Sequence, residues 1–482
     1  MMRPVLPPAG KSKEQILAEL QSARTQDARW REGRSFSMVY PAGEEITRVV
    51  EEAYLLYAGE NGLNPTAFPS VRKLENEVVG MVAGLLGGDS ETAGILTSGG
   101  TESILMALLA ARQWGLKKEP PIERPEVVLA ANAHPAFDKA AHYFGLQVVR
   151  VAVREDFRAD PPAMEAAINP RTVLMVGSAP TYPQGVVDPI AELAEIAQKH
   201  GILFHVDACV GGMMLPFLRR LGYPVPPFDL SLPGVTSLSV DLHKYGYAAK
   251  GASVILYRNK ALRRQQFFAT TDWSGGIYAS TALAGTRSGG PAAAAWAVLN
   301  YLGEEGYLHL ADTVMKTALY IRQEIEHILG LKVLSDPEMS LMALVSDHPA
   351  LDIYDVGDEL GQRGWFMDRQ QFPPSLHLTI NPLHAELADL FLRDLAESVA
   401  LARRSSLRRS VRSLGISTAN FLARWLPERW VTRLTESAGR LVGGENGGLP
   451  QRSAAMYGLL GSLPNRGDLK ELVLDILDRL NS

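Results

Sequence analysis

The stretch GILTSGGTESILMA at residues 94–107 places a short apolar run, a glycine-rich turn and a longer apolar run in immediate succession. The first run has the length of a strand, whereas the apolar pattern that starts at Ser103 continues to Ala111 and fits a buried helix. A turn that joins a strand to a helix is the repeating connection in proteins whose parallel sheet is covered by helices. This stretch therefore predicts an α/β fold.

The same alternation continues toward the C-terminus. Six further strand-like runs follow, namely EVVLAA (126–131), LQVVRVAV (146–153), TVLMVGS (172–178), ILFHVDA (202–208), TSLSVD (236–241) and SVILYRN (253–259). Amphipathic stretches lie between several of them, including Ala136–Phe144 and Ile190–His200. Continuous β-branched runs separated by helices are typical of a mainly parallel sheet with both faces covered, and we predict such a sheet here.

The pattern changes along the chain predict three domains. Residues 1–88 form a Pro-rich tail and a helical segment that is broken at Gly59–Ser70, and residues 89–306 form the large α/β domain. Residues 307–482 form a smaller C-terminal α+β domain. Its expected elements are the strands LKVLS, LMALVSD and SLHLTIN and helices at Leu308–Leu329, Ile353–Arg363, Ala385–Arg404 and Asp468–Leu480.

An arginine-rich insertion at residues 403–450 interrupts this last domain. Residues 403–440 hold nine arginines and two acidic residues, interleaved with apolar side chains such as Trp425 and Trp430, before the linker GGENGG. Such a segment can lie on an anionic membrane surface. A solvated flap or a dimer-packing element is favoured slightly over membrane contact, because a glycine and a proline interrupt any long amphipathic face.

Composition and charge exclude several classes of protein. The 482 residues carry a formal net charge of −5, and a mildly acidic chain lacks the basic surface that nucleic-acid binding requires. The one cysteine, Cys209, excludes an internal disulfide and every multi-thiolate metal site, and it suits a reducing compartment. No run reaches the roughly 18 apolar residues of a membrane-spanning helix, and prolines occupy the place of a secretory signal's apolar core. We therefore expect a soluble, cytoplasmic protein.

The glycine-rich turn Thr97–Ser103 is the first of three features that can carry chemistry. Glycines let the backbone approach an anion closely, and the helix that follows presents unpaired N–H groups. The hydroxyls of Ser98, Thr101 and Ser103 can add donors. The turn fits a phosphate site, and it fits equally well an ordinary helix start that is capped by a hydroxyl residue.

An aspartate and a lysine at strand ends are the other two features. Asp207 ends the run ILFHVDA, at the edge where α/β sheets bind ligands, although a lone aspartate there can simply cap the next helix. Lys244 follows SLSVDL, and burial of its ammonium group would favour the neutral amine, which is a nucleophile. A surface lysine in a turn is the alternative.

Together these three features match a cradle for pyridoxal 5′-phosphate. The helix start would hold the cofactor phosphate, and Asp207 would keep the pyridine nitrogen protonated so that the ring accepts electrons. Lys244 would form a Schiff base with the cofactor aldehyde. We therefore predict an enzyme that uses pyridoxal phosphate.

Several motifs also resemble the sphingosine-1-phosphate lyases, which belong to the pyridoxal-phosphate decarboxylase-like enzymes of the type I aminotransferase fold. The motifs are TSGGTESILMA (97–107), APTYPQGVVDPI (179–190), HVDACVGG (205–212), DLHKYGYAAKGAS (241–253), TDWSGGIYAS (271–280) and AGTRSGG (284–290). The likeness runs from about Tyr40 to Ala402 and resumes at Ala454–Leu477. The pair TDWSGGIYAS and HKYGYAAKG is more specific to the lyases than to amino-acid decarboxylases.

The resemblance assigns cofactor contacts to residues at matching positions. It implies Gly100, Thr101 and His243 at the cofactor phosphate, His134 stacked on the ring, Asp207 at the ring nitrogen and Lys244 as the anchor. Without the resemblance, His134 fits a helix cap or a surface position.

The resemblance also implies a substrate site. Tyr40, Tyr182 and Lys250 match residues around the substrate, with Lys250 near its phosphate, although the same residues fit half-buried aromatics and an ordinary loop lysine. Asn64 stands where the lyases usually carry a histidine close to the substrate phosphate. An asparagine can donate a hydrogen bond but carries no positive charge, so one element of the substrate site is altered.

The activity that the resemblance implies is cleavage of a carbon–carbon bond in a phosphorylated long-chain base. The expected products are a fatty aldehyde and phosphoethanolamine. Lys244 and His243 are candidates for the proton steps, and Tyr182 and Lys250 for orienting the phosphate end. Relatives with this fold usually build the active site between two subunits, so the resemblance implies a homodimer.

Two other interpretations stay open. An amino-acid decarboxylase on the same scaffold would need a cation for the substrate carboxylate, and Arg287 in AGTRSGG could supply it or could instead reach the cofactor phosphate across a dimer interface. A non-catalytic, membrane-associated scaffold would act through the arginine-rich insertion. The presence of both Asp207 and Lys244 weighs against such a scaffold.

Overall fold

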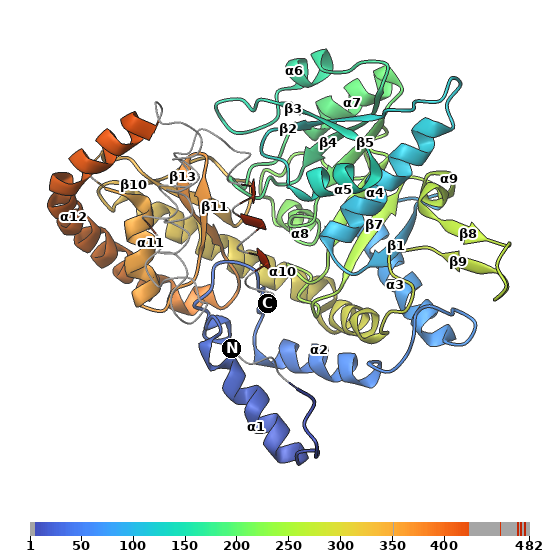
Figure 1. The fold of residues 1–482 in the computed structure, drawn as a ribbon, viewed down its shortest axis with the longest axis horizontal. Coiled ribbons are helices and arrows are strands. Elements are labelled where there is room, and N and C mark those ends of the chain that lie inside the picture. Colours follow the sequence, from blue (N-terminus) through green and yellow to red (C-terminus); the bar gives the residue numbers. More distant parts are fainter. Residues whose placement is uncertain are drawn as a thin grey trace.

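A seven-stranded sheet organises the larger part of the molecule, with the strand order β1-β7-β6-β5-β4-β2-β3 (Figure 1). Its strands are β1 (Ala93–Thr97), β2 (Glu126–Ala130), β3 (Gln147–Val151), β4 (Thr172–Ser178), β5 (Leu203–Asp207), β6 (Ser237–Asp241) and β7 (Ser253–Tyr257). Strands β2 to β6 are parallel, whereas β7 runs antiparallel to both β6 and β1. The predicted α/β fold with a mainly parallel sheet is confirmed.

The computed structural model describes residues 5–349, 351–423, 454, 470, 471, 473, 474, 477 and 478, with the backbone alone for residues 26 and 405–423. Residues 424–450 of the arginine-rich insertion and part of the predicted helix Asp468–Leu480 lie outside these described residues. No helix in the described part of the chain is long and apolar enough to cross a bilayer.

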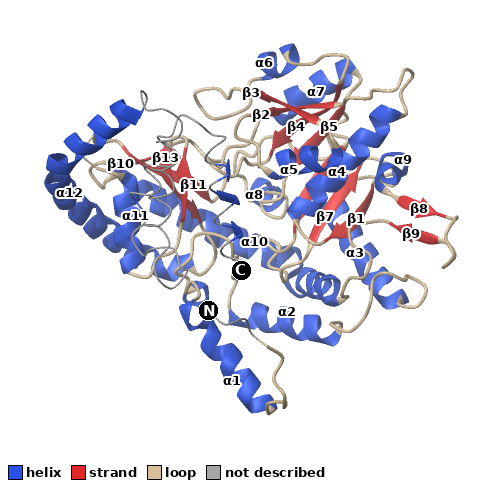
Figure 2. Ribbon diagram, in the orientation of Figure 1, coloured by secondary structure: helices blue, strands red, loops and turns tan. Residues whose placement is uncertain are grey.

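Helices cover both faces of the large sheet (Figure 2). One face packs against α4 (Gly100–Leu116) and α5 (Ala136–Phe144), and the other packs against α3 (Pro69–Leu85), α7 (Ile190–His200) and α8 (Leu215–Arg220). Two short helices, α6 (Pro161–Ala166) and α9 (Lys260–Arg263), complete this part.

Strand β2 shows why the sequences of these strands are continuous apolar runs. Its residues Val127 and Leu129 belong to the cluster under α4 and α5, whereas Val128 and Ala130 belong to the cluster on the other face. Because successive side chains of a strand point to opposite faces, burial on both sides requires an apolar residue at every position.

The carboxyl ends of the strands bring the chemical groups together. Ser178 at the end of β4 lies opposite Asp207 of β5, and Asp207 lies opposite Ser239 of β6. Strand β1 ends at the same edge, because two antiparallel pairings separate it from β6. The glycine-rich turn, Asp207 and the segment after Asp241 therefore meet at one edge of the sheet, where α/β proteins bind ligands.

A four-stranded antiparallel sheet forms the smaller C-terminal part, in the order β10-β11-β13-β12. Its elements are β10 (Leu331–Val333), β11 (Leu341–Ser346), β12 (Asp368–Gln371), β13 (Pro374–Thr379), α11 (Ile353–Gln362) and α12 (His384–Ala423). The long helix α10 (Gly290–Glu326) leads into this sheet and is kinked at Gly303, which has φ 55° and ψ −170°. The sequence pattern predicts only the second half of α10 and does not predict β12.

The N-terminal segment lies along both parts. Helix α2 (Glu44–Leu56) packs on α10, and Ser35 forms a bridge with Phe366 of the small domain. Helix α1 (Lys13–Ala23) has no buried residue and projects from the body (Figure 1). A hairpin of β8 (Phe268–Thr270) and β9 (Tyr278–Ser280), which the sequence pattern does not predict, extends from the large domain on the side away from α12.

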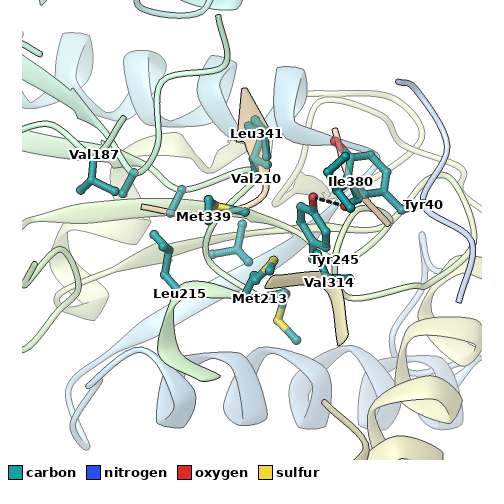
Figure 3. Packing of buried hydrophobic residues seen from close by; sticks show 14 of the residues in the cluster. Tyr40, Val187, Val210, Met213, Leu215, Tyr245, Val314, Met339, Leu341 and Ile380 are labelled. Carbon is teal, nitrogen blue, oxygen red and sulfur yellow. Dashed lines mark hydrogen bonds between the residues drawn. The ribbon is translucent and has the colours of Figure 1, made fainter. Parts of the chain in front are cut away.

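Buried residues from the two sheets share one core next to the strand edge. Figure 3 shows Val210, Met213 and Leu215 of the large domain facing Met339 and Leu341 of the small domain. In the same view the Tyr245 hydroxyl donates a 2.7 Å hydrogen bond to the Ile380 carbonyl. Because Tyr245 is fully buried and directly follows Lys244, this contact fixes the backbone of the lysine turn against the small domain.

Candidate active site

A cavity of about 440 Å³ opens at the carboxyl edge of the large sheet. Nine of the ten site residues predicted from the sequence line it: Tyr40, Gly100, Thr101, His134, Tyr182, Asp207, His243, Lys244 and Lys250. They come from the N-terminal segment, the β1–α4 turn and the segments after β2, β4, β5 and β6. Only the tenth residue, Asn64, lies elsewhere.

Lys244 forms an ion pair that the sequence analysis did not assign. Its Nζ lies 2.9 Å from Oδ2 of Asp241, which is 3% exposed. Burial alone would lower the pKa of Lys244, but the Asp241 carboxylate raises that pKa well above its usual value. Burial alone would raise the pKa of Asp241, and Lys244 instead holds it below its usual range. The pair is therefore charged at neutral pH, and the expectation that burial favours the neutral amine of Lys244 is wrong for the cofactor-free site, because Asp241 supplies a counter-ion.

The glycine-rich turn leaves no room for a side chain at its centre. A Cβ at Gly100 would lie 2.7 Å from both carboxylate oxygens of Asp241 and 2.8 Å from Sγ of Cys209. Helix α4 begins at Gly100, so the unpaired N–H groups of its first turn lie at the cavity wall. The turn therefore combines a close backbone approach with the positive end of a helix dipole.

Two of the three hydroxyls expected as anion donors are engaged within the protein. Ser103 is buried and its Oγ lies 2.6 Å from Oγ1 of Thr97, and the Ser98 hydroxyl donates to Oε2 of Glu102 at 2.6 Å. The expectation that Ser98 and Ser103 serve as free donors is therefore wrong. Thr101, which is exposed at the cavity, retains that role.

Asp207 presents one free carboxylate oxygen. Its Oδ1 accepts hydrogen bonds from the Cys209 N–H at 3.1 Å and from the Ser239 hydroxyl at 3.4 Å. Among the described residues, Oδ2 has no hydrogen-bond partner. Asp207 thus lines the cavity with one oxygen fixed and the other available to a ligand.

The two cavity histidines are neutral near pH 7. Burial lowers the pKa of His134, whose Nδ1 accepts the Ala136 N–H at 3.1 Å at the start of α5. His134 is therefore a helix cap as well as a cavity residue. Burial also lowers the pKa of His243 although Asp241 lies 3.7 Å from its Nε2. The buried Nδ1 of His243 has no hydrogen-bond partner among the residues that the structure describes.

Lys250 lies at the mouth of the cavity. Its Nζ donates to the Met38 carbonyl at 2.5 Å and lies 5.7 Å from the centre of the Tyr40 ring. Burial, and next the charge of Lys244, lower the pKa of Lys250 to about 8. Met38 has φ 64°, in the left-handed region that non-glycine residues rarely adopt, so its backbone is strained at the point where it holds the lysine.

The small domain contributes to the site through Tyr182. The Tyr182 hydroxyl donates to Oδ2 of Asp368 at 2.6 Å, and its ring lies 4.1 Å from the ring of His377. Burial, and next Asp368, raise the pKa of Tyr182 well above its usual value, so its hydroxyl stays protonated. Tyr182 is therefore a fixed, neutral wall of the cavity.

Asn64 and Arg287 lie outside this cavity. Asn64 Oδ1 accepts the backbone N–H groups of Thr66 and Ala67 at 3.0 and 3.1 Å, which makes it the cap of a turn. Arg287 makes two 3.0 Å hydrogen bonds to the carboxylate of Glu75 on α3. In a single chain, neither side chain reaches the residues around Lys244.

Sequence reasoning missed Asp241, Asp368 and Met38. Asp241 had a usable signal, since it ends the buried strand SLSVD three residues before Lys244. Asp368 had none, because the contact joins positions 186 residues apart. Met38 is placed by a backbone conformation that no residue pattern in this segment predicts.

Comparison with known proteins places the chain among related sequences and structures. Residues 5–345 match the family model of the pyridoxal-dependent decarboxylase conserved domain. The chain is 45% identical to sphingosine-1-phosphate lyase 1 of Rattus norvegicus, over 82% of this chain and 69% of that protein. It is 38% identical to sphingosine-1-phosphate lyase of Oryza sativa subsp. japonica, over 99% of this chain and 82% of that protein.

Solved structures agree with the sequence relatives. The structure of a Burkholderia pseudomallei sphingosine-1-phosphate lyase matches with a TM-score of 0.80 and 40% identity, covering 86% of this chain and 96% of that one. Glutamate decarboxylase of Lactobacillus brevis matches with a TM-score of 0.74 at 17% identity, covering 84% and 96%, and so shares the fold.

Proposed function

Because this chain belongs to the sphingosine-1-phosphate lyases within the pyridoxal-dependent decarboxylase family, we propose that it cleaves a phosphorylated 2-amino-3-hydroxy long-chain base. The products would be a fatty aldehyde and phosphoethanolamine. The observation that carries this substrate class is the pair of cavity lysines, Lys244 and Lys250, beside a glycine-rich helix start. The cavity thus offers separate cationic groups to a cofactor and to a substrate phosphate.

Pyridoxal phosphate is the cofactor of this family, and the residues of the cavity fit it. Gly100 has no space for a Cβ, so the backbone forms a cradle that only glycine allows. Within the described part of the chain, the buried His243 Nδ1 and Asp241 Oδ1 lack hydrogen-bond partners, as expected of polar atoms that face a ligand.

The residues that would hold the cofactor follow from this arrangement. The first turn of α4 with Gly100, Thr101 and His243 would bind its phosphate, and His134 would lie against its ring. The free oxygen of Asp207 would pair with the ring nitrogen, and the amine of Lys244 would anchor the aldehyde. The bound cofactor supplies a ring that accepts the electron pair released when the Cα–Cβ bond of the substrate breaks.

The protein's own groups would then handle binding and protons. Lys250, charged below about pH 8, would hold the substrate phosphate, and Tyr182 and Tyr40 would form the wall that orients the chain. The 3-hydroxyl must lose a proton as the aldehyde leaves, and the Cα must gain one. His243, which is neutral, can accept a proton. Lys244, once released from the aldehyde and held as an ammonium group beside Asp241, can donate one.

An amino-acid decarboxylase is less well supported. Such an enzyme needs a cation at the substrate carboxylate, and arginine is the usual choice because it binds carboxylates through two hydrogen bonds. No arginine lines the cavity in the part of the chain that the structure describes. The candidate named from the sequence, Arg287, is instead engaged with Glu75.

Product analysis tests the proposed reaction. The purified holoenzyme is incubated with a phosphorylated sphingoid base and, separately, with a panel of amino acids. Mass spectrometry should detect a long-chain aldehyde and phosphoethanolamine in equal amounts. Release of carbon dioxide from an amino acid, with no aldehyde from the lipid, would overturn the proposal in favour of a decarboxylase.

The anchor role of Lys244 has its own test. Lys244→Ala should abolish turnover and the visible absorbance of the loaded enzyme, and borohydride should no longer attach the cofactor to the protein. A variant that retains both turnover and absorbance would refute the assignment.

We further propose that the enzyme is a homodimer whose subunits complete each other's sites. The hairpin β8–β9 and its turn expose Phe268 (60%), Trp273 (56%) and Ile277 (79%), and large apolar side chains gathered on one exposed element are typical of an interaction surface. Arg287 lines a second cavity beside this hairpin rather than the one around Lys244, and Asn64 lies in the chain between two other residues of its lining, Leu63 and Pro65. Light scattering should give twice the mass of one chain, and Trp273→Asp with Ile277→Asp should shift the protein toward monomers and lower its activity.

Membrane contact through residues 403–440 and a cytoplasmic location are also proposals. The arginine-rich composition supports membrane contact, and the single cysteine suits a reducing compartment. Sedimentation with anionic liposomes, before and after deletion of residues 403–440, tests the membrane contact, and unchanged binding would reject it. Cell fractionation tests the cytoplasmic location.

A further inference from the structure

Behind Asp207 lies a chain of buried polar side chains that the proposed mechanism does not use. The Ser239 hydroxyl that donates to Asp207 also lies 3.2 Å from Nε2 of His205. Nδ1 of His205 lies 2.9 Å from the hydroxyl of Ser237. This chain of hydrogen bonds runs between the neighbouring strands β5 and β6 and ends at Oδ1 of Asp207.

The direction of these hydrogen bonds can be assigned. His205 and Ser239 are both fully buried, so their polar atoms depend on one another. Burial lowers the pKa of His205 to about 4, so the ring is neutral near pH 7 and has one donor and one acceptor nitrogen. Since the single hydroxyl proton of Ser239 is given to Asp207, Nε2 of His205 must be the donor to Ser239, and Nδ1 accepts from Ser237.

This chain of hydrogen bonds orients Asp207. It fixes Oδ1 together with the Cys209 N–H, which leaves Oδ2 as the oxygen available at the cavity. An aligned Oδ2 can accept the N–H of a protonated ring nitrogen, and that hydrogen bond favours the protonated ring.

We propose that Ser239 and His205 are positioning residues that hold Asp207 aligned with the cofactor ring nitrogen, so that this nitrogen stays protonated. Ser239 acts directly on Asp207, and His205 acts through Ser239. The inference rests on the proposed function, because it requires pyridoxal phosphate in this cavity. It assigns a role to two residues of which neither lines the cavity.

The test measures the protonation of the ring nitrogen itself. Wild type and Ser239→Ala are loaded with cofactor labelled with ¹⁵N in the ring, and the ¹⁵N chemical shift and the cofactor dissociation constant are measured. In the wild type the signal should have the position of a pyridinium nitrogen. In Ser239→Ala it should move toward the position of neutral pyridine, and the dissociation constant should rise roughly three- to tenfold, as for loss of one hydrogen bond.

A second variant and a control separate positioning from packing. His205→Leu should move the ¹⁵N signal in the same direction by a smaller amount. Ser398→Ala removes another fully buried hydroxyl, one that donates to the Asp394 carbonyl at 2.7 Å on α12, and should leave the signal unchanged. If His205→Leu does not fold, Ser239→Ala decides alone, because it removes a single oxygen atom.

The outcomes distinguish this inference from the proposed function. A wild-type ¹⁵N signal and dissociation constant in Ser239→Ala would overturn the inference, even if the enzyme cleaves phosphorylated long-chain bases. A pyridinium signal that Ser239→Ala shifts, in an enzyme that releases no aldehyde, would uphold the inference and reject the proposed reaction.

Discussion

Asp241→Asn should destabilise the cofactor-free enzyme strongly and in a pH-dependent way. The substitution keeps the shape of the side chain but removes the counter-ion that lies 2.9 Å from Lys244. Breaking a buried ion pair by removing one partner costs about 3–5 kcal/mol, because the remaining charge is left uncompensated. Lys244 can avoid being a buried, unpaired charge by losing its proton. The free energy of deprotonating Lys244 is therefore the upper limit of the loss of stability.

The upper limit of the loss of stability follows from the ordinary lysine pKa. Deprotonating a group of pKa ~10.4 at pH 7 costs about 4.6 kcal/mol, and at pH 9 about 1.9 kcal/mol. In the wild type the raised pKa of Lys244 contributes stability that is fully present below pH ~10. The contribution of this pair to the free energy of unfolding therefore does not change between pH 7 and pH 9. In Asp241→Asn the pKa of Lys244 should fall below that of the unfolded chain, so the loss of stability grows as the pH decreases.

The assay is thermal unfolding of the cofactor-free enzyme at pH 7 and pH 9. For a chain of this length the unfolding entropy is about 1 kcal/mol/K, so the midpoint of Asp241→Asn should lie ~4 °C below wild type at pH 7 and ~2 °C below at pH 9. Adding cofactor should reduce the difference, because it engages the Lys244 amine.

Asp229→Asn is the matched control for this prediction. Asp229 is equally buried (3% exposed) and pairs with Arg219 at 3.1 Å, outside the cavity. Because arginine does not release its proton in this pH range, the loss of stability in this variant should be the same at pH 7 and pH 9. The reasoning is refuted if Asp241→Asn lowers the midpoint by less than ~1 °C at pH 7, or by the same amount at both pH values.

Three further predictions concern the phosphate-binding side of the site. Gly100→Ala should raise the cofactor dissociation constant about 5- to 100-fold, since its Cβ would lie 2.7 Å from the Asp241 oxygens and overpacking costs about 1–3 kcal/mol. In the control Gly84→Ala nothing lies within 4 Å of the added Cβ, so the dissociation constant should stay unchanged. The KM for phosphorylated substrate should rise at the pH where Lys250 loses its charge, which is about 8 in the cofactor-free site and higher once the cofactor engages Lys244. Lys250→Arg should abolish that rise, so a persistent rise would exclude Lys250 as its cause. Because Asn64 lies outside the cavity of its own chain, a contact there requires the proposed homodimer; with it, Asn64→His should lower the same KM roughly three- to tenfold by adding a charge-assisted contact. An unchanged or higher KM would argue against a phosphate contact at position 64.

The strands and the main site residues were predictable because a single physical rule places them. A strand buried on both faces must be apolar throughout, and the first polar residues after it emerge at the sheet edge. That rule located Asp207 and Lys244 from the sequence, and the cavity contains both. The same rule applied to Asp241 would have located the counter-ion, since it too ends a buried strand.

Other parts of the site follow from tertiary contacts that leave no local pattern. Strand β12 has the sequence DRQQ and no apolar alternation, so neither the strand nor the contact of Asp368 with Tyr182 was predictable. Ser103 looked like a donor because it follows the glycine-rich turn. Its hydroxyl is used instead by Thr97 and Ser253, which only the fold brings next to it.

The two cavity lysines show why residue type and spacing cannot assign chemical roles. Lys244 and Lys250 are six residues apart and both line the same cavity, yet their pKa values shift in opposite directions. The Asp241 carboxylate keeps Lys244 charged. Among the described residues, the hydrogen-bond partners of Lys250 are carbonyl oxygens, and the charge of Lys244 repels it. Because each charge influences the other, engaging the Lys244 amine removes a positive neighbour of Lys250. Cofactor loading should therefore raise the pKa of Lys250 and strengthen its hold on a substrate phosphate at the moment when the site is ready to use it.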